Sequence, residues 1–99
     1  QVRILTVTYD HKEYAKKVFE RLRDEGWRVE LDGRNEKLGY KIREAQLAKI
    51  PYAVVIGDKE VAAETLAPRR RGGENLPPTP LVDFIRRLES EVAQEMGAA

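Results

Sequence analysis

The order of apolar and polar residues along the chain predicts a sheet whose strands alternate with helices. The segment from Val2 to Thr8 is apolar and rich in β-branched residues, which predicts a first strand. The segment from Tyr52 to Ile56 is apolar throughout, as is typical of a central strand covered on both faces. The segment from Trp27 to Leu31 alternates apolar and polar residues, which favours a less completely covered strand at the sheet edge.

Three segments have the spacing of helices. In the first, Asp10 is a candidate N-cap and Gly26 is well placed to end the helix. The apolar stripe of this helix consists of Ala15, Val18, Phe19 and Leu22. The second helix is expected from about Leu38 to Lys49, because Pro51 disfavours helical backbone at the residue before it. The third is expected to begin at Thr79-Pro80, a hydroxyl cap followed by proline at the first helical position.

The segment between the second and third helices predicts two more strands. Thr65 to Arg71 is expected as a fourth strand, although Pro68 suits an edge or a bulge better than a paired interior. A short fifth strand is expected near Asn75-Leu76, and Gly57 to Glu60 is expected to be a loop. This order of elements predicts one α/β domain over residues 1–99, a three-layer α/β/α arrangement with three helices on the two faces of the sheet.

Composition narrows the function classes. A chain of 99 residues is large enough for one core, and its 35% of charged residues nearly cancel to a net charge of +1. It contains no Cys, which excludes a disulfide framework and a Cys-based zinc site. No apolar run approaches the roughly 20 residues of a membrane span, and no signal peptide opens the chain. Because the chain starts with Gln rather than Met, we expect a domain of a longer protein.

If the first three strands are parallel, the loops after them meet at one edge of the sheet, where ligands bind in such folds. One interpretation of that edge is enzymatic, with Asp10, Asp32 and Asp58 as ligands of Mg²⁺. Lys59 would then contact a phosphate, as in a phosphotransfer domain. Against it, Asp10 is explained as a helix cap and Asp32 as part of a turn, and the chain has no glycine-rich phosphate loop. His11 has no Ser or Cys partner in a recognisable motif and is expected to face solvent.

The other interpretation of the edge is a surface for single-stranded RNA. Basic residues outnumber acidic ones in the segment 34–49, and Arg69 to Arg71 add a second basic group that would hold phosphates. The basic residues of the first group are Arg34, Lys37, Lys41, Arg43 and Lys49. A basic run is more often a solvated face, so charge by itself does not decide between these interpretations.

Three stretches of the chain carry a family resemblance. They are Arg34-Asn35-Glu36-Lys37-Leu38-Gly39-Tyr40-Lys41-Ile42-Arg43-Glu44, Ala48-Lys49-Ile50-Pro51-Tyr52 and Gly57-Asp58-Lys59-Glu60-Val61. These stretches resemble the C-terminal anticodon-binding domain of threonyl-tRNA synthetases, and the similarity covers nearly the whole chain. The resemblance implies a five-stranded mixed sheet in the order 2-1-3-4-5, with the fourth strand antiparallel.

The resemblance also implies which residues contact the anticodon. The residues at matching positions are Asn35, Lys49, Glu60, Arg69 and Val7. From the residues alone, Asn35 is explained equally well as a helix cap. Two departures from the family pattern, Pro68 and the proline-rich segment 76–80, affect the strands around Arg69.

The function implied by the resemblance is recognition of the anticodon loop of threonine tRNA. A separate catalytic domain of the same chain, using ATP and zinc, would aminoacylate the tRNA. The domain itself is expected to be non-catalytic and to hold no cofactor or metal, and the parent enzyme to be a cytoplasmic homodimer without membrane association. The alternative is a free-standing or repurposed domain of this kind that binds a protein or a small molecule.

Overall fold

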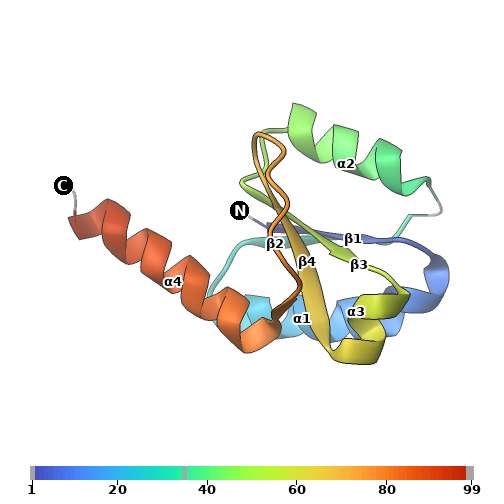
Figure 1. The fold of residues 1–99 in the computed structure, drawn as a ribbon, viewed down its shortest axis with the longest axis horizontal. Helices are drawn as coiled ribbons and strands as arrows, with labels where there is room; N and C mark the ends of the chain where they lie inside the picture. Colours follow the sequence, from blue (N-terminus) through green and yellow to red (C-terminus); the bar gives the residue numbers. More distant parts are fainter. Residues whose placement is uncertain (1, 35, 98–99) are drawn as a thin grey trace.

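The computed structural model describes residues 2–34 and 36–97. Its sheet has five strands in the order β2-β1-β3-β4-β5 (Figure 1). β1 pairs in parallel with β2 and β3, β4 runs antiparallel to β3, and β5 runs antiparallel to β4. The strands are β1 (Val2–Thr6), β2 (Val29–Asp32), β3 (Tyr52–Ile56), β4 (Thr65–Arg70) and β5 (Thr79–Pro80). The α/β class, the strand order and the antiparallel fourth strand are therefore confirmed.

Four α-helices and one turn of 3-10 helix occur in the described part of the chain. They are η1 (Tyr9–His11), α1 (Lys12–Asp24), α2 (Leu38–Leu47), α3 (Asp58–Ala63) and α4 (Leu81–Gly97). The expectation of three helices is wrong, because residues expected as a loop after β3 begin the short helix α3. Its six residues are too few to show a helical period, although Asp58 and Glu60 place carboxylates in the first turn, where the helix dipole favours them.

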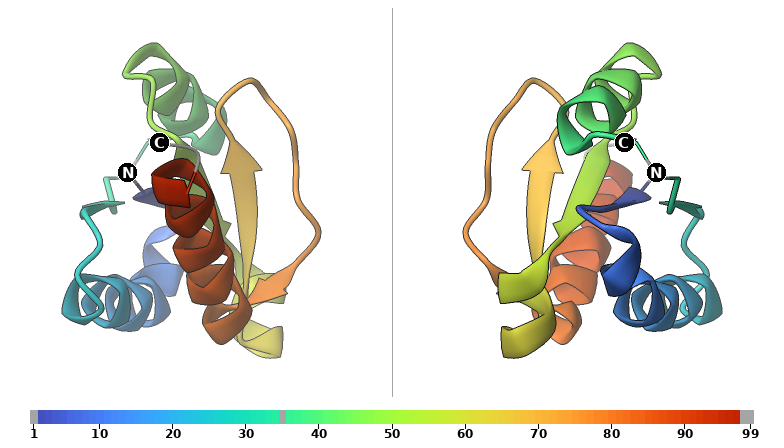
Figure 2. Two further views of the ribbon diagram at one scale, coloured as in Figure 1. Left: turned by 90° about the vertical axis from the view of Figure 1, so that its left-hand side faces the viewer. Right: turned by 90° about the vertical axis from the view of Figure 1, so that its right-hand side faces the viewer.

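Helices cover both faces of the sheet, which confirms the three-layer arrangement. α1 and α4 lie on one face and α2 on the other, as the two views along the sheet show (Figure 2). Alternate residues of β1 divide between the faces, so that Ile4 lies in the main core and Leu5 in a smaller core beneath α2. The main core also contains Val18, Leu22, Val54, Ile56, Phe84 and Leu88. The buried residues of the smaller core are Leu5, Ala45 and Ala53.

Some element bounds differ from expectation. β2 begins at Val29 rather than Trp27, at the sheet edge as expected. The fifth strand is formed by Thr79 and Pro80, whereas Asn75 makes only an isolated bridge to Arg69. Consequently α4 begins one residue later than expected, and the Thr79 hydroxyl donates to the carbonyl oxygen of Pro77 at 2.7 Å rather than capping the helix.

Pro68 lies inside β4, opposite Val54, without interrupting the pairing with β3. In an antiparallel strand, the nitrogen and carbonyl oxygen of one residue point to the same side. The oxygen of Pro68 accepts from the backbone N–H of Leu76 at 3.0 Å, on the side away from β3. Its nitrogen, which has no hydrogen, therefore also points away from β3, and the ladder loses no donor.

Candidate nucleic-acid interface

Val7 and Glu60 meet at the carboxyl ends of β1 and β3. The backbone N–H of Val7 donates to the carbonyl oxygen of Ile56 at 3.0 Å, and Val7 is 38% exposed. Gly57 follows Ile56 and donates its N–H to Oε1 of Glu60 at 2.7 Å. A Cβ atom on Gly57 would lie 3.0 Å from Cγ2 of Val7 and 3.2 Å from Oε1 of Glu60. Sequence reasoning did not single out Gly57, yet its lack of a side chain allows these two predicted site residues to approach each other.

Arg69 lies on β4, opposite Ala53, on the face of the sheet that α2 covers. It lines a hollow of about 250 Å³ between the N-terminal half of α2, the strands β3 and β4, and the segment after β4. The other lining residues are Leu38, Ile42, Val55, Ala67, Pro68, Asn75 and Leu76. Mostly apolar walls with one guanidinium and one amide residue, Asn75, suit an unpaired base, which presents flat faces for packing and polar edges for hydrogen bonding.

The three consecutive arginines do not act as one group. Arg70 lies on the side of α4, where its Nη2 is 3.6 Å from a carboxylate oxygen of Glu91 and its guanidinium carbon is 5.9 Å from the centre of the Tyr52 ring. Arg71 is exposed, and its backbone N–H donates to the carbonyl oxygen of Pro51 at 2.9 Å. Arg69 and Arg71 therefore remain for a ligand on the α2 side, and Arg70 is part of the contact with α4.

Lys49 lies just past the C-terminal end of α2, near the end of β4. Its backbone has a φ of 57°, the left-handed region, and its N–H donates to Gln46 at 3.0 Å. The next N–H, of Ile50, donates to Ala45 at 3.0 Å, which completes the Schellman end of the helix. The exposed side chain thus starts from a position that glycine usually occupies.

The predicted site residues therefore form two groups rather than one cluster. Val7 and Glu60 lie at the edge where the parallel strands end, and Lys49 and Arg69 lie toward the opposite edge, with Arg71. The hollow that contains Arg69 begins at Leu38, in the first turn of α2, and so extends between the two groups. Asn35 lies outside the described residues.

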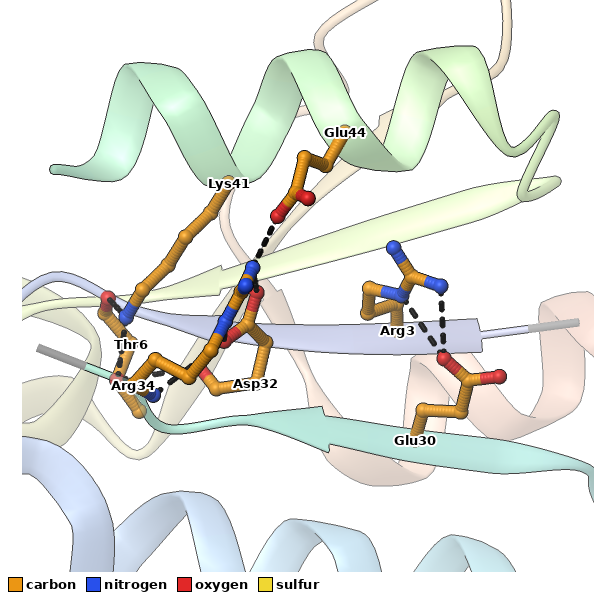
Figure 3. A network of polar contacts seen from close by, with 7 residues as sticks. All are labelled: Arg3, Thr6, Glu30, Asp32, Arg34, Lys41 and Glu44. Atoms are coloured by element: carbon orange, nitrogen blue, oxygen red, sulfur yellow. Dashed lines mark hydrogen bonds and ion pairs between the residues drawn. The ribbon is translucent and has the colours of Figure 1, made fainter. Parts of the chain in front are cut away.

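A polar network fixes the loop between β2 and α2 (Figure 3). Arg34 donates from Nε and Nη2 to the two carboxylate oxygens of Asp32, each at 2.9 Å, and also from Nη2 to Glu44 on α2. The Arg34 hydrogen bonds hold the pKa of Asp32 below its ordinary value, although burial opposes this shift. Arg34 was expected among the RNA-facing cations, but it joins β2 to α2 instead.

Lys41 is also directed inward, and its assignment to an exposed basic face is wrong. The residue is 1% exposed, and its Nζ donates to the carbonyl oxygen of Thr6 at 2.9 Å and to the Thr6 hydroxyl at 3.3 Å. Burial lowers the pKa of Lys41, while the nearby carboxylate of Asp32 opposes that shift. A long aliphatic stem allows such a residue to cross beneath a helix and reach acceptors at the end of a neighbouring strand.

The three aspartates of the enzymatic interpretation do not come together. Asp32 is bound to Arg34, and Asp58 contacts His11. Among the described residues there is no group of three or more His, Cys, Asp or Glu side chains that could hold a metal ion. His11 is 5% exposed rather than solvent-facing, with Nε2 2.6 Å from Oδ1 of Asp58. The sequence gives only one sign of this contact: both residues follow strands that were expected to be parallel.

Comparison with known proteins identifies the family. A family model described as "Anticodon binding domain" matches residues 1–91. The chain belongs to the anticodon-binding domain family. It is 52% identical over 93 residues to a threonine–tRNA ligase of Caldanaerobacter subterraneus subsp. tengcongensis, and the aligned residues make up 94% of this chain and 14% of that protein. It is 63% identical over 75 residues to the threonine–tRNA ligase of Maridesulfovibrio salexigens, which covers 76% of this chain and 12% of that protein.

Solved structures agree with this assignment. The RNA binding domain of threonyl-tRNA synthetase from Cryptosporidium parvum Iowa II has a TM-score of 0.86 at 29% identity, over 91% of this chain and 23% of that one. A prolyl-tRNA synthetase from Cryptosporidium parvum has a TM-score of 0.83 at 18% identity, over 95% of this chain and 20% of that one, and shares the fold. The resemblance to the threonyl-tRNA synthetase anticodon-binding domain is thus confirmed, and the repurposed-domain alternative finds no support. In the described residues of this anticodon-binding domain, no helix has the length and apolar character needed to cross a membrane.

Replacing Asp32 by Asn should weaken the anticodon-binding domain at neutral pH but not in acid. The pKa of Asp32 is lower in the folded state than in the unfolded chain. The contribution of its carboxylate to the stability of the fold is therefore complete above the unfolded pKa of about 4, and it is lost as the pH falls through the pKa of the folded state. We expect Asp32→Asn to lower the free energy of unfolding by about 1 kcal/mol at neutral pH, the scale of one hydrogen bond. Urea unfolding of both proteins across the acid range measures this difference.

Glu30→Gln is the matched control, because Glu30 is an exposed carboxylate on the same strand as Asp32 and is paired with Arg3 at 2.9 Å. An exposed pair contributes little, so this variant should behave like wild type. A deficit for Asp32→Asn that stayed constant down to the lowest pH would contradict the role of its charge.

Replacing Lys49 by Gly should stabilise the anticodon-binding domain. The left-handed backbone at Lys49 strains an L-residue with a side chain, whereas glycine adopts it freely. We expect Lys49→Gly to raise the free energy of unfolding by about 0.5–1 kcal/mol and Lys49→Ala to give no such gain. Thermal and urea unfolding of both variants measure the effect, and equal loss of stability in the two would refute it.

Proposed function

We propose that this domain binds the anticodon loop of threonine tRNA and thereby orients the tRNA for aminoacylation. The observation that carries the proposal is the 52% identity, across 94% of the chain, to a threonine–tRNA ligase. The chain spans 14% of that relative, so the ligase reaction belongs to the remainder of a parent enzyme. We assign ATP and zinc to its catalytic domain, and we take the parent enzyme to be a cytoplasmic homodimer.

The geometry supports base reading by two of the described residues. Codons for threonine begin with adenine and cytosine, so the anticodon ends in guanine and uracil. Arg69 presents a planar fork of donors that matches the acceptor edge of guanine. Oε1 of Glu60 accepts a hydrogen bond from the Gly57 N–H. The second carboxylate oxygen has no hydrogen-bond partner among the described residues, and it would accept from an amino or imino group of a base.

The other described residues would hold the RNA without reading it. Val7 would supply an apolar contact beside Glu60, since its side chain is exposed at the end of β1. Lys49 and Arg71 would pair with phosphates at the other end of α2. Asn35 remains assigned to base recognition through the family resemblance, and its place in the sequence is three residues before the first residue of α2.

Glu60→Ala and Arg69→Ala should reduce discrimination as well as affinity. Each variant loses one base contact, so it should bind a threonine anticodon stem-loop roughly 1–3 kcal/mol more weakly. The loss should be smaller for a stem-loop in which the guanine and uracil are replaced. Binding isotherms of each variant with both stem-loops make the test. If both variants fold normally and weaken the two stem-loops equally, these residues do not read bases.

Binding should weaken as salt rises, because phosphate contacts release counterions. Arg71→Ala should reduce the slope of log affinity against log salt by about 0.7, the value for one contact to a single strand. Arg70→Ala is the matched control, because Arg70 contacts Glu91 and should leave the slope unchanged. Lys49→Gly should lower affinity even though it stabilises the fold. A slope near zero for the wild-type domain would count against this phosphate-binding surface.

A further inference from the structure

Helix α3 carries Glu60 but has little to hold it in place. None of its side chains is buried, and its largest apolar residue, Val61, is 37% exposed. A helix of six residues is too short to be stable without outside contacts. The position of Glu60 in space therefore depends on the contacts at the two ends of α3.

At the start of α3, His11 supplies a side-chain hydrogen bond from outside the helix. Its ring is buried, and Nε2 lies 2.6 Å from Oδ1 of Asp58, the first residue of α3. The backbone N–H of Thr8 points to Nδ1 at 3.3 Å. Since a backbone N–H only donates, Nδ1 is an acceptor and Nε2 carries the proton that it donates to Asp58. Neighbouring groups thus fix both the tautomer and the orientation of the ring.

At the end of α3, the contact comes from α1. The hydroxyl of Tyr14 donates to the carbonyl oxygen of Thr65, two residues after the helix, at 3.1 Å. Burial raises the pKa of Tyr14, and the carboxylates of Glu64 and Glu60 raise it further, so the hydroxyl keeps its proton. Both side chains that hold α3 therefore belong to the segment that follows Val7 along the chain.

We propose that His11 is a positioning residue for anticodon recognition: through Asp58 it fixes the start of α3 and so sets Glu60 beside Val7. The proposal rests on the function proposed above for Glu60. It assigns a role to the only histidine of the chain, which lies outside the groups that would touch RNA. A His11 that served folding alone would change stability without affecting the choice between anticodons.

A double-mutant cycle on the whole chain separates these two roles. His11→Ala, Glu60→Ala and the double variant are titrated with the threonine anticodon stem-loop and with the stem-loop in which guanine and uracil are replaced. We expect His11→Ala to weaken binding of the threonine stem-loop by roughly three- to tenfold, the scale of one hydrogen bond, and that of the other stem-loop much less. In the Glu60→Ala background, His11→Ala should cause no further loss, because it acts through Glu60.

Further variants keep the test valid if His11→Ala disturbs folding. The side chain of Asp58 is 98% exposed, so Asp58→Ala removes the same hydrogen bond without opening a cavity and should reproduce the loss. Asp58→Asn retains the acceptor oxygen and should restore binding, as should His11→Gln, which retains a donor. Asp10→Ala changes an exposed residue of the same turn and should bind like wild type.

Three results would overturn the proposal. The first is an equal loss for both stem-loops, and the second is a loss that adds fully to that of Glu60→Ala; either would make His11 a folding residue only. The third is a Glu60→Ala variant that binds both stem-loops like wild type, which would remove the proposed role of Glu60 itself. A failure of the proposed function is thus recognised from Glu60→Ala alone, before His11 is considered.

Discussion

β1 and β3 lie side by side and run in the same direction, with Thr6 opposite Ile56 at their carboxyl ends. This parallel pairing requires a helix between the strands to cross back over the sheet, so the loops after both strands open at the same edge. Val7 follows one strand and Gly57 the other, and the bond from the Val7 N–H to Ile56 continues the ladder past the end of β1. Because Glu60, His11 and the start of α2 all follow the carboxyl ends of parallel strands, this pairing places them near the same edge of the sheet.

Charged residues in this domain serve two separate purposes. Arg34, Lys41 and Arg70 are bound by the protein itself, and they attach α2 and α4 to the sheet. α2 needs such contacts, because the core beneath it is much smaller than the core on the other face. Lys37, Arg43, Lys49 and Arg71 are exposed cations on the side of α2, and Arg69 is partly exposed there. A net charge of +1 is therefore compatible with a local RNA-binding surface.

The sequence predicted what depends on local pattern and missed what depends on distant polar contacts. Apolar periodicity located the first four strands and the three longer helices, since each buries a regular face. α3 was missed because six residues show no period, and β5 because two paired residues have no pattern of their own. The sequence also could not show that Lys41 reaches Thr6 or that His11 reaches Asp58, 47 residues away. The assignment to anticodon binding came from the family resemblance, because the charge pattern by itself left it open.

The most direct measurement is a map of the surface that contacts RNA. Amide chemical shifts of the isotopically labelled chain would be followed while the threonine anticodon stem-loop is added. If the anticodon binds across the hollow between α2 and β4 and the adjoining edge where β1 and β3 end, the largest changes will fall on Val7, Gly57, Glu60, Arg69 and the first turn of α2. Changes confined to the outer faces of α1 and α4, with those residues unaffected, would show that the anticodon loop does not bind at this site.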